Sequence, residues 1–216
     1  MVLFLLGEEV HFPTVFTMEN RPSYQSYREL SQSELEGIDY SIQVVQKTDE
    51  FSVMAIHGGR IEPGTTEIAR SLAGNDLSLY LFEGMRSIDN QRLHITSSEF
   101  DEPQALEFAS RSQTCISIHG YRELNPVKER ICMGGLNISL QRVIGEALTD
   151  YFPDLDVEIE CQKFPAKDPE NIVNRCKNTG VQMEFSLAAR NRFVTDAAWA
   201  NRLSSVIRSA MSAWNP

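Results

Sequence analysis

The sequence has few cysteines, the residues that stabilise small disulfide-rich proteins and zinc ribbons. Only four cysteines occur among 216 residues. They are isolated at positions 115, 132, 161 and 176, without a Cys-x-x-Cys pair. This spacing disfavours a disulfide framework or a cysteine-rich zinc ribbon. We therefore expect four reduced, buried thiols in a reducing cytoplasm.

Positive charge is also scarce. Lys and Arg number 20 against 30 Asp and Glu, which gives a formal net charge of -10. Because nucleic acids and anionic membranes attract clustered positive charge, neither is expected as a partner. An anionic substrate would have to meet a local cationic patch.

Long apolar runs are missing from the amino-terminal segment. Met1 to Leu6 is apolar, but Gly7 and two glutamates end the run. It lacks a basic region and is too short for a signal peptide or a membrane span, so a cytoplasmic location is expected. The remaining composition, 42% hydrophobic and 23% charged, is typical of a globular chain, and the length suits one domain.

Short β-rich runs alternate with stretches of helical periodicity. The predicted strands are Ile38 to Val45, Phe51 to His57, Leu77 to Phe82, Arg92 to Thr96, Thr114 to His119, Val157 to Cys161 and Val181 to Ser186, of which the first two form a pair joined by a polar turn. The predicted helices are Thr65 to Ala73, Pro103 to Ser110, Ile138 to Tyr151 and Thr195 to Trp214. This alternation indicates an α/β fold with a mixed sheet flanked by helices.

Two of these strands end in the same tripeptide, Ile-His-Gly, at His57 and at His119. Ligand sites of α/β sheets form outside the carboxyl ends of strands. A histidine at such an end leaves the buried sheet and faces the crevice, and the following glycine permits a sharp turn. A single histidine there is more often a hydrogen-bonded packing residue, but two identical strand ends favour metal binding.

A glutamate follows the first histidine in a loop. Gly58-Gly59 and Pro63-Gly64 flank Glu62, so the chain between them can fold the carboxylate back beside His57. Two imidazoles and one carboxylate are the ligand set of hydrolytic zinc sites that keep a fourth position open for water. The sequence therefore predicts a zinc site formed by His57, Glu62 and His119.

Five ordered segments resemble the poly-γ-glutamate hydrolase family, whose members are often described as phage-related replication proteins. The segments are Ala55 to Glu67, Leu93 to Ser97, Ser117 to Gly120, Asn171 to Arg175 and Gly180 to Ser186. The family is related to carboxypeptidase A-like zinc peptidases. The resemblance implies a single compact domain with a carboxypeptidase-like zinc peptidase fold and one zinc ion per chain. Residues 1–20 then form an amino-terminal extension, and residues 21–216 form the zinc hydrolase domain.

The resemblance also implies roles for individual residues. It makes His57, Glu62 and His119 the zinc ligands and Glu184 the catalytic general base. A carboxylate outside the ligand set can take a proton from water and pass it to a leaving amine. The alternative for Glu184 is an ordinary solvent-facing carboxylate, because Gln182, Glu184 and Ser186 alternate with apolar residues along their strand.

Substrate binding is implied for Asn174 and Arg175, which resemble the Asn-Arg pair that holds a substrate carboxylate in carboxypeptidase A-like enzymes. A planar guanidinium suits a carboxylate because it can bind both oxygens. The alternative is an arginine that pairs with Asp168 or Glu170. Arg60, and also Arg122, are expected to add positive charge.

His94 shares the family signature, but a structural histidine is the favoured interpretation. The predicted function is that of a zinc-dependent amidohydrolase that cleaves γ-glutamyl amide bonds in poly-γ-glutamate or γ-linked peptides, acts as a monomer and could be released by phage lysis. The alternative is a non-catalytic binding module associated with phage or replication, whose histidines are structural.

Overall fold

The computed structural model describes residues 24–123 and 128–215. The predicted amino-terminal extension, residues 1–20, lies outside the described residues. Along the described ranges, no helix combines the length and hydropathy that a membrane crossing needs.

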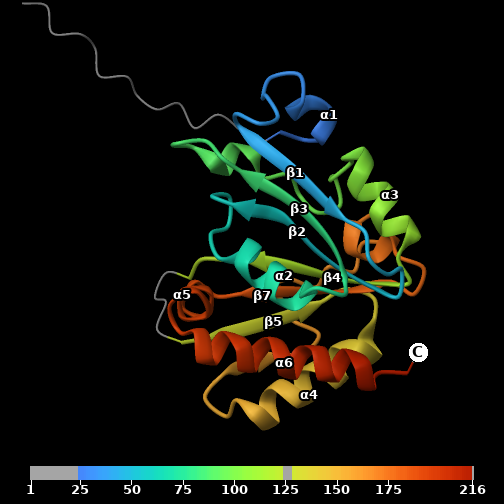
Figure 1. Cartoon of the computed structure of the whole chain (residues 1–216), viewed down its shortest axis with the longest axis vertical. Helices are drawn as coiled ribbons and strands as arrows, with labels where there is room; N and C mark the ends of the chain where they lie inside the picture. The colour runs from blue at the N-terminus through green and yellow to red at the C-terminus, as the bar shows by residue number, and fades with distance from the viewer. Residues whose placement is uncertain (1–23, 124–127, 216) are drawn as a thin grey trace, which may run out of the picture.

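Seven strands form one mixed sheet in the order β1-β3-β2-β4-β7-β5-β6 (Figure 1). Their bounds are β1 (Tyr40–Val45), β2 (Phe51–Gly59), β3 (Ser78–Gly84), β4 (Thr114–Gly120), β5 (Arg130–Gly134), β6 (Asp156–Glu158) and β7 (Gly180–Phe185). The central pairs β3/β2, β2/β4 and β4/β7 are parallel, whereas β1/β3 and β5/β7 are antiparallel. The carboxyl ends of β2, β4 and β7 therefore meet at one edge of the sheet.

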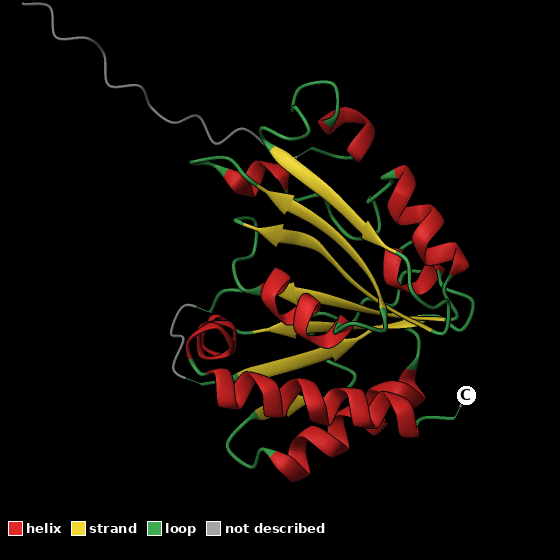
Figure 2. Cartoon of the chain, viewed as in Figure 1, coloured by secondary structure: helices red, strands yellow, loops and turns green. Residues whose placement is uncertain are grey.

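Helices cover both faces of this sheet (Figure 2). One face packs against α2 (Thr65–Ala73), α4 (Ile138–Tyr151), α5 (Leu187–Thr195) and α6 (Ala197–Ala213). The other packs against α1 (Tyr27–Leu30), α3 (Pro103–Arg111) and the 3-10 turns η1 (Asn90–Leu93) and η2 (Ile172–Arg175). The predicted class, an α/β domain with a mixed sheet between helices, is confirmed.

Each face of the sheet has its own apolar core because side chains alternate along a strand. On β2, Val53 and Ala55 join the core under α2 and α6, and Met54 and Ile56 join the opposite core. All four are fully buried. At about 25 cal/mol per Å², burial on both faces is the main stabilising contribution to the central strands.

Two predictions about the elements are wrong. β1 and β2 are not neighbours, because β3 lies between them and pairs with both. The predicted strand Arg92 to Thr96 is instead the end of η1 followed by a loop. The predicted helix from Thr195 to Trp214 is confirmed as α6, and Asp196 caps its start by accepting a hydrogen bond from the Trp199 N–H. The sequence patterns do not predict β5 or α5.

The cysteine prediction requires a correction as well. Cys115 and Cys176 form a disulfide, and Cys132 and Cys161 are free. All four are buried, as expected. A separation of 61 residues gives no local signal for the pairing. It arises because η2 packs beside the start of β4.

Candidate metal centre

His57 reaches the site through an irregularity in β2. Met54 of β2 lies beside Ser117 of β4, so strict alternation would place His57 and His119 on opposite faces of the sheet. The pairing of β2 with β3 instead shifts by one residue between Ala55 and Gly58. This bulge moves His57 onto the face that carries His119.

Glu62 returns to His57 through the loop between β2 and α2. The Glu62 N–H donates to the His57 carbonyl at 3.0 Å, and the Thr65 hydroxyl donates to the Glu62 carbonyl at 2.8 Å. Gly64 adopts a φ of 100°, in the left-handed region that favours glycine, where α2 begins. The loop that the sequence predicts is thus present, and it aims the carboxylate at the strand ends.

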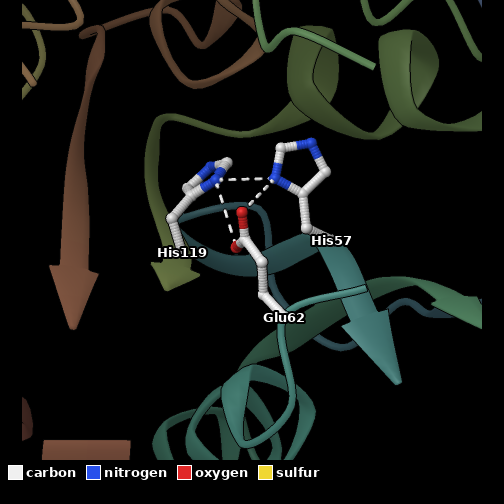
Figure 3. A group of neighbouring side chains, drawn as sticks. All are labelled: His57, Glu62 and His119. Carbon is white, nitrogen blue, oxygen red and sulfur yellow. Dashed lines mark hydrogen bonds and ion pairs between the residues drawn. The ribbon is translucent and has the colours of Figure 1, made fainter. Parts of the chain in front are cut away.

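The three predicted ligands converge on one point (Figure 3). His57 Nδ1 lies 3.0 Å from Glu62 Oε1 and 3.1 Å from His119 Nδ1. Glu62 Oε2 lies 3.9 Å from His119 Nδ1, and it accepts a hydrogen bond from the Gly120 N–H at 2.7 Å. Both imidazoles are 2% exposed and Glu62 is 9% exposed, so the cluster is shielded from solvent.

The remote ring nitrogens of both histidines are already engaged. His57 Nε2 lies 2.8 Å from the carbonyl oxygen of Ile95, which can only accept, so this nitrogen carries a proton. His119 Nε2 lies 2.8 Å from the Ser117 hydroxyl. Such partners fix the ring orientation of metal-binding histidines and direct the other nitrogen to the metal. Here both Nδ1 atoms point to the shared centre.

The three groups of the cluster shift one another's pKa values. Burial alone would lower the pKa of His57, but the adjacent Glu62 carboxylate outweighs burial and raises it. Burial would likewise raise the pKa of Glu62, yet His57 reverses this and lowers it. Burial, reinforced by the charge of His57, lowers the pKa of His119 to about 3. His119 is therefore neutral near pH 7, as a ligand must be.

Glu184 lies beside the ligand set on β7. It is the register partner of His119 and is 6% exposed. Its Oε1 accepts a hydrogen bond from Gln182 Nε2 at 2.8 Å. Burial, and next the negative charge of Glu62, raise the pKa of Glu184 to about 8. The carboxylate is therefore not the solvent-facing group of the alternative interpretation.

A cavity of about 400 Å³ opens over these residues. Among the described residues, its lining includes His57, Glu62, His119 and Glu184, together with Gln91, His94, Thr96, Ser97, Tyr121, Arg122, Phe164 and Arg190. The His94 ring stacks on His57 with centroids 3.8 Å apart, and its Nε2 lies 3.3 Å from Glu62 Oε1. His94 thus lines the cavity beside the cluster, although the sequence favoured a structural role for it.

Comparison with known proteins identifies the family. A model of the poly-gamma-glutamate hydrolase family matches residues 24–213. The chain belongs to the poly-γ-glutamate hydrolase family. It is 37% identical to the UPF0714 protein YndL of Bacillus subtilis (strain 168) over 169 residues, which are 77% of this chain and 65% of YndL. Identity to the UPF0714 protein YmaC of the same organism is 33% over 205 residues, or 94% of this chain and 84% of YmaC.

Two solved structures of similar proteins share the fold of this family member. A bacteriophage poly-gamma-glutamate hydrolase superposes with a TM-score of 0.79 at 33% identity and covers 89% of this chain and 97% of that one. The zinc-free apo form of YndL superposes with a TM-score of 0.80 at 30% identity, over 89% of this chain and 98% of that one. The chain spans less than two thirds of the full length of YndL.

Other predicted residues of this poly-γ-glutamate hydrolase family member lie outside the cavity. Asn174 donates to the carbonyls of Ala166 and Asp168, and its Oδ1 accepts from the Leu136 N–H. Arg175 pairs with Glu170, as in the alternative interpretation. The structure does not bring these two residues to the ligand set.

Arg60 does not line the cavity either, because it donates to the Arg86 carbonyl at the surface. The cations that do line it are Arg122 and Arg190. Arg122 follows the His119-Gly120 strand end, so its place could be predicted from the sequence. Arg190 carried no signal, because the helix that holds it was not predicted.

Proposed function

We propose that this protein hydrolyses γ-glutamyl amide bonds with a single zinc ion held by His57, Glu62 and His119. The observation that carries the proposal is the convergence of these three ligand atoms within 4.8 Å of one another, in a cavity that also contains Glu184. Structural histidines would not need a buried carboxylate between their free nitrogens and an acid beside them.

The donor set fits zinc. Two imidazole Nδ1 atoms and a carboxylate, with both histidines anchored through Nε2, are the chemistry of catalytic zinc sites that hold three protein ligands. His57 Nδ1 and His119 Nδ1 lie 3.1 Å apart and both lie near the Glu62 carboxylate, so one cation can contact all three groups. When bound, zinc acts as a Lewis acid that polarises a carbonyl and lowers the pKa of a water.

Glu184 supplies the proton transfers in this proposal. It lines the cavity, and Gln182 holds one of its oxygens, so the other oxygen is free to face the substrate. Its carboxylate takes the proton of the attacking water and passes it to the nitrogen of the leaving amine. An acid with a pKa near the working pH suits both directions, and burial brings the pKa of Glu184 to about 8.

Arg122 is the residue that we assign to the substrate carboxylate. Each unit of a γ-linked glutamyl chain carries a free α-carboxylate near the scissile amide, and this charge needs a partner. Arg122 lines the cavity and is exposed, so its guanidinium is accessible. A local cation of this kind offsets the net charge of -10 because charges farther than about 8 Å are screened at physiological salt.

The function is tested with zinc-loaded protein supplied in parallel with poly-γ-glutamate and α-linked polyglutamate, and the sizes of the products are measured. We expect cleavage of the γ-linked chain alone, and cleavage of neither polymer would contradict the proposal. Elemental analysis gives a second readout, for which we expect His57→Ala to hold about one zinc per chain fewer than the wild type. We also expect a monomer that needs neither nucleic acid nor membrane.

A further inference from the structure

Arg190 is the largest fully buried side chain of the molecule's described part. It lies in α5, directly after β7, and is 2% exposed. A buried guanidinium is costly unless its donors are satisfied, so its partners show what it holds. No acidic side chain among the described residues forms an ion pair with it.

Its partners are three backbone carbonyls at the edges of the site. Nη2 donates to the Tyr121 carbonyl at 3.0 Å and Nε donates to the Phe185 carbonyl at 3.3 Å, while Nη1 donates to the Pro63 carbonyl. Pro63 follows Glu62 and Phe185 follows Glu184, and Tyr121 comes two residues after His119. One guanidinium therefore joins the three segments that deliver Glu62, His119 and Glu184.

Two glycines make room for this side chain. A Cβ on Gly120 would lie 2.6 Å from Arg190 Cζ, and a Cβ on Gly64 would lie 2.9 Å from Arg190 Cβ. Gly120 also donates its N–H to Glu62 Oε2. The packing around the guanidinium thus extends to the backbone that holds a ligand oxygen.

We propose that Arg190 is a positioning residue, whose fork of donors holds the strand ends and the loop at the separation that zinc binding and proton transfer require. This inference rests on the proposed zinc site. The planar guanidinium suits the task because it presents five N–H donors in a fixed arrangement, which the single ammonium of lysine cannot reproduce. Removal of an outer-shell group that orients metal ligands commonly lowers metal affinity about 10–100-fold.

The test compares Arg190→Ala and Arg190→Lys with Arg192→Ala, a matched control on the exposed side of the same helix. Zinc dissociation constants are measured by competition with a chromogenic chelator. We expect both Arg190 variants to bind zinc about 10–100-fold more weakly than the control. Equal zinc affinity in all three proteins overturns the proposal, as does full rescue by lysine, because charge alone would then suffice.

A second variant keeps the test valid if Arg190 variants do not fold. Gly120→Ala leaves Arg190 in the sequence but displaces its guanidinium, and we expect the same loss of zinc affinity. When residue 190 is already alanine, the methyl group added at position 120 meets no guanidinium. The double variant Arg190→Ala/Gly120→Ala should therefore bind zinc no more weakly than Arg190→Ala alone. Additive losses overturn the proposal.

A double-mutant cycle of Arg190→Ala and Gly120→Ala on the thermal stability of metal-free protein separates this inference from the proposed function. If the wild type binds no zinc, the proposed function fails, and the unfolding cycle still decides whether Arg190 and Gly120 act together.

A second cluster of metal-binding side chains lies apart from the predicted centre. Cys132 of β5 and Glu158 of β6 are register partners, and the Cys161 N–H donates to the Met133 carbonyl at 2.8 Å. Ligand atoms of Cys132, Glu158 and Cys161 lie within 4.8 Å of one another. The cysteines are 2% and 0% exposed, and Glu158 is half-buried, which leaves a route for an ion.

We infer that this cluster binds a soft divalent cation. Cys132 Sγ lies 3.7 Å from Glu158 Oε2. A tetrahedral site with bonds of about 2.0–2.3 Å places its ligand atoms roughly 3.3–3.8 Å apart, so little movement is required. Among the described residues no lysine or arginine forms an ion pair with Glu158, so its charge is available to the ion. Binding releases the two thiol protons to solvent.

Cobalt(II) is the probe, because thiolate ligands give it a near-ultraviolet charge-transfer band. In His57→Ala/His119→Ala protein, which lacks the first site, we expect about one cobalt per chain and this band, and the loss of both after Cys132→Ser/Cys161→Ser. Absence of the band, or a mass showing that Cys132 and Cys161 are joined as a disulfide, overturns the inference. If the histidine variant does not fold, the loss of the band between wild type and the serine variant decides.

Discussion

The two faces of β4 and β7 differ sharply although the same strands form both. Toward α4 and α6 the strands present a mainly apolar face, which includes Ile116, Ile118, Val181, Met183 and Phe185. The opposite face carries Ser117, His119, Gln182 and Glu184, all buried and polar. Burying apolar groups stabilises the fold, whereas burying a carboxylate costs free energy unless it has a partner. On these two strands, one face therefore packs an apolar core and the other carries the candidate site residues.

Neighbouring residues of β4 give the strongest test of this division. Replacing His119 with alanine removes a ligand, and we expect the zinc of this centre to be lost and hydrolysis to fall below detection. Replacing Ile118 with alanine should lower the free energy of unfolding by about 2–5 kcal/mol but leave zinc content and activity intact below the melting temperature. Metal analysis and denaturant unfolding of both variants decide. Loss of zinc from Ile118→Ala at a temperature where it is folded contradicts the division.

Glu184 and Met183 repeat the comparison on β7. Glu184→Gln keeps the shape and removes the base, so we expect kcat to fall about 10²–10⁴-fold with zinc affinity unchanged. Met183→Ala should lower the free energy of unfolding and leave kcat unchanged, because the Met183 side chain packs on the opposite face. Steady-state kinetics and chelator competition measure both quantities. Undiminished turnover by Glu184→Gln removes this residue from the mechanism.

The two candidate carboxylate-binding arginines differ in the same way. Arg122 lines the cavity, so we expect Arg122→Ala to raise KM for poly-γ-glutamate about tenfold with a small change in kcat. Arg175 pairs with Glu170 and does not line the cavity, so Arg175→Ala should leave KM within about twofold of the wild type. The reverse order of effects would restore the assignment that the sequence favoured.

The smallest expected effect concerns stability against pH in metal-free protein. Burial raises the pKa of Glu184 to about 8 from an ordinary value of 4.5. The folded state therefore holds a proton that the unfolded state releases, and this contribution is full below pH 4.5 and lost as the pH rises through 8. Glu184→Gln should be more stable than wild type at pH 9, by on the order of 1–3 kcal/mol, but not at pH 5.

Thermal unfolding with a chelator at both pH values measures this difference. Glu67→Gln, on the exposed side of α2, is the control for loss of one carboxylate. An equal gain in the control at pH 9 would show that net charge, and not the burial of Glu184, produces the effect.

Local patterns predicted much of the fold. Helices α2 and α4 begin and end as their apolar periodicity indicates, and five of the strands overlap the predicted core strands closely. Those runs are strongly patterned and bounded by turn residues. Predictions failed where the deciding contact is remote in sequence, as for the insertion of β3 between β1 and β2 and the disulfide between Cys115 and Cys176. The strand β5 was missed because its five residues show no distinctive pattern.

The site divides along the same line. The sequence by itself determined which residues have the chemistry of a zinc site, because His57 and His119 end apolar strands and glycines surround Glu62. Only the tertiary structure decided that they meet. The bulge in β2 turns His57 to the face of His119, and Arg190 joins backbone segments that lie far apart in the chain. Residue type and spacing record what a side chain can do, whereas strand register and long-range packing set where it points.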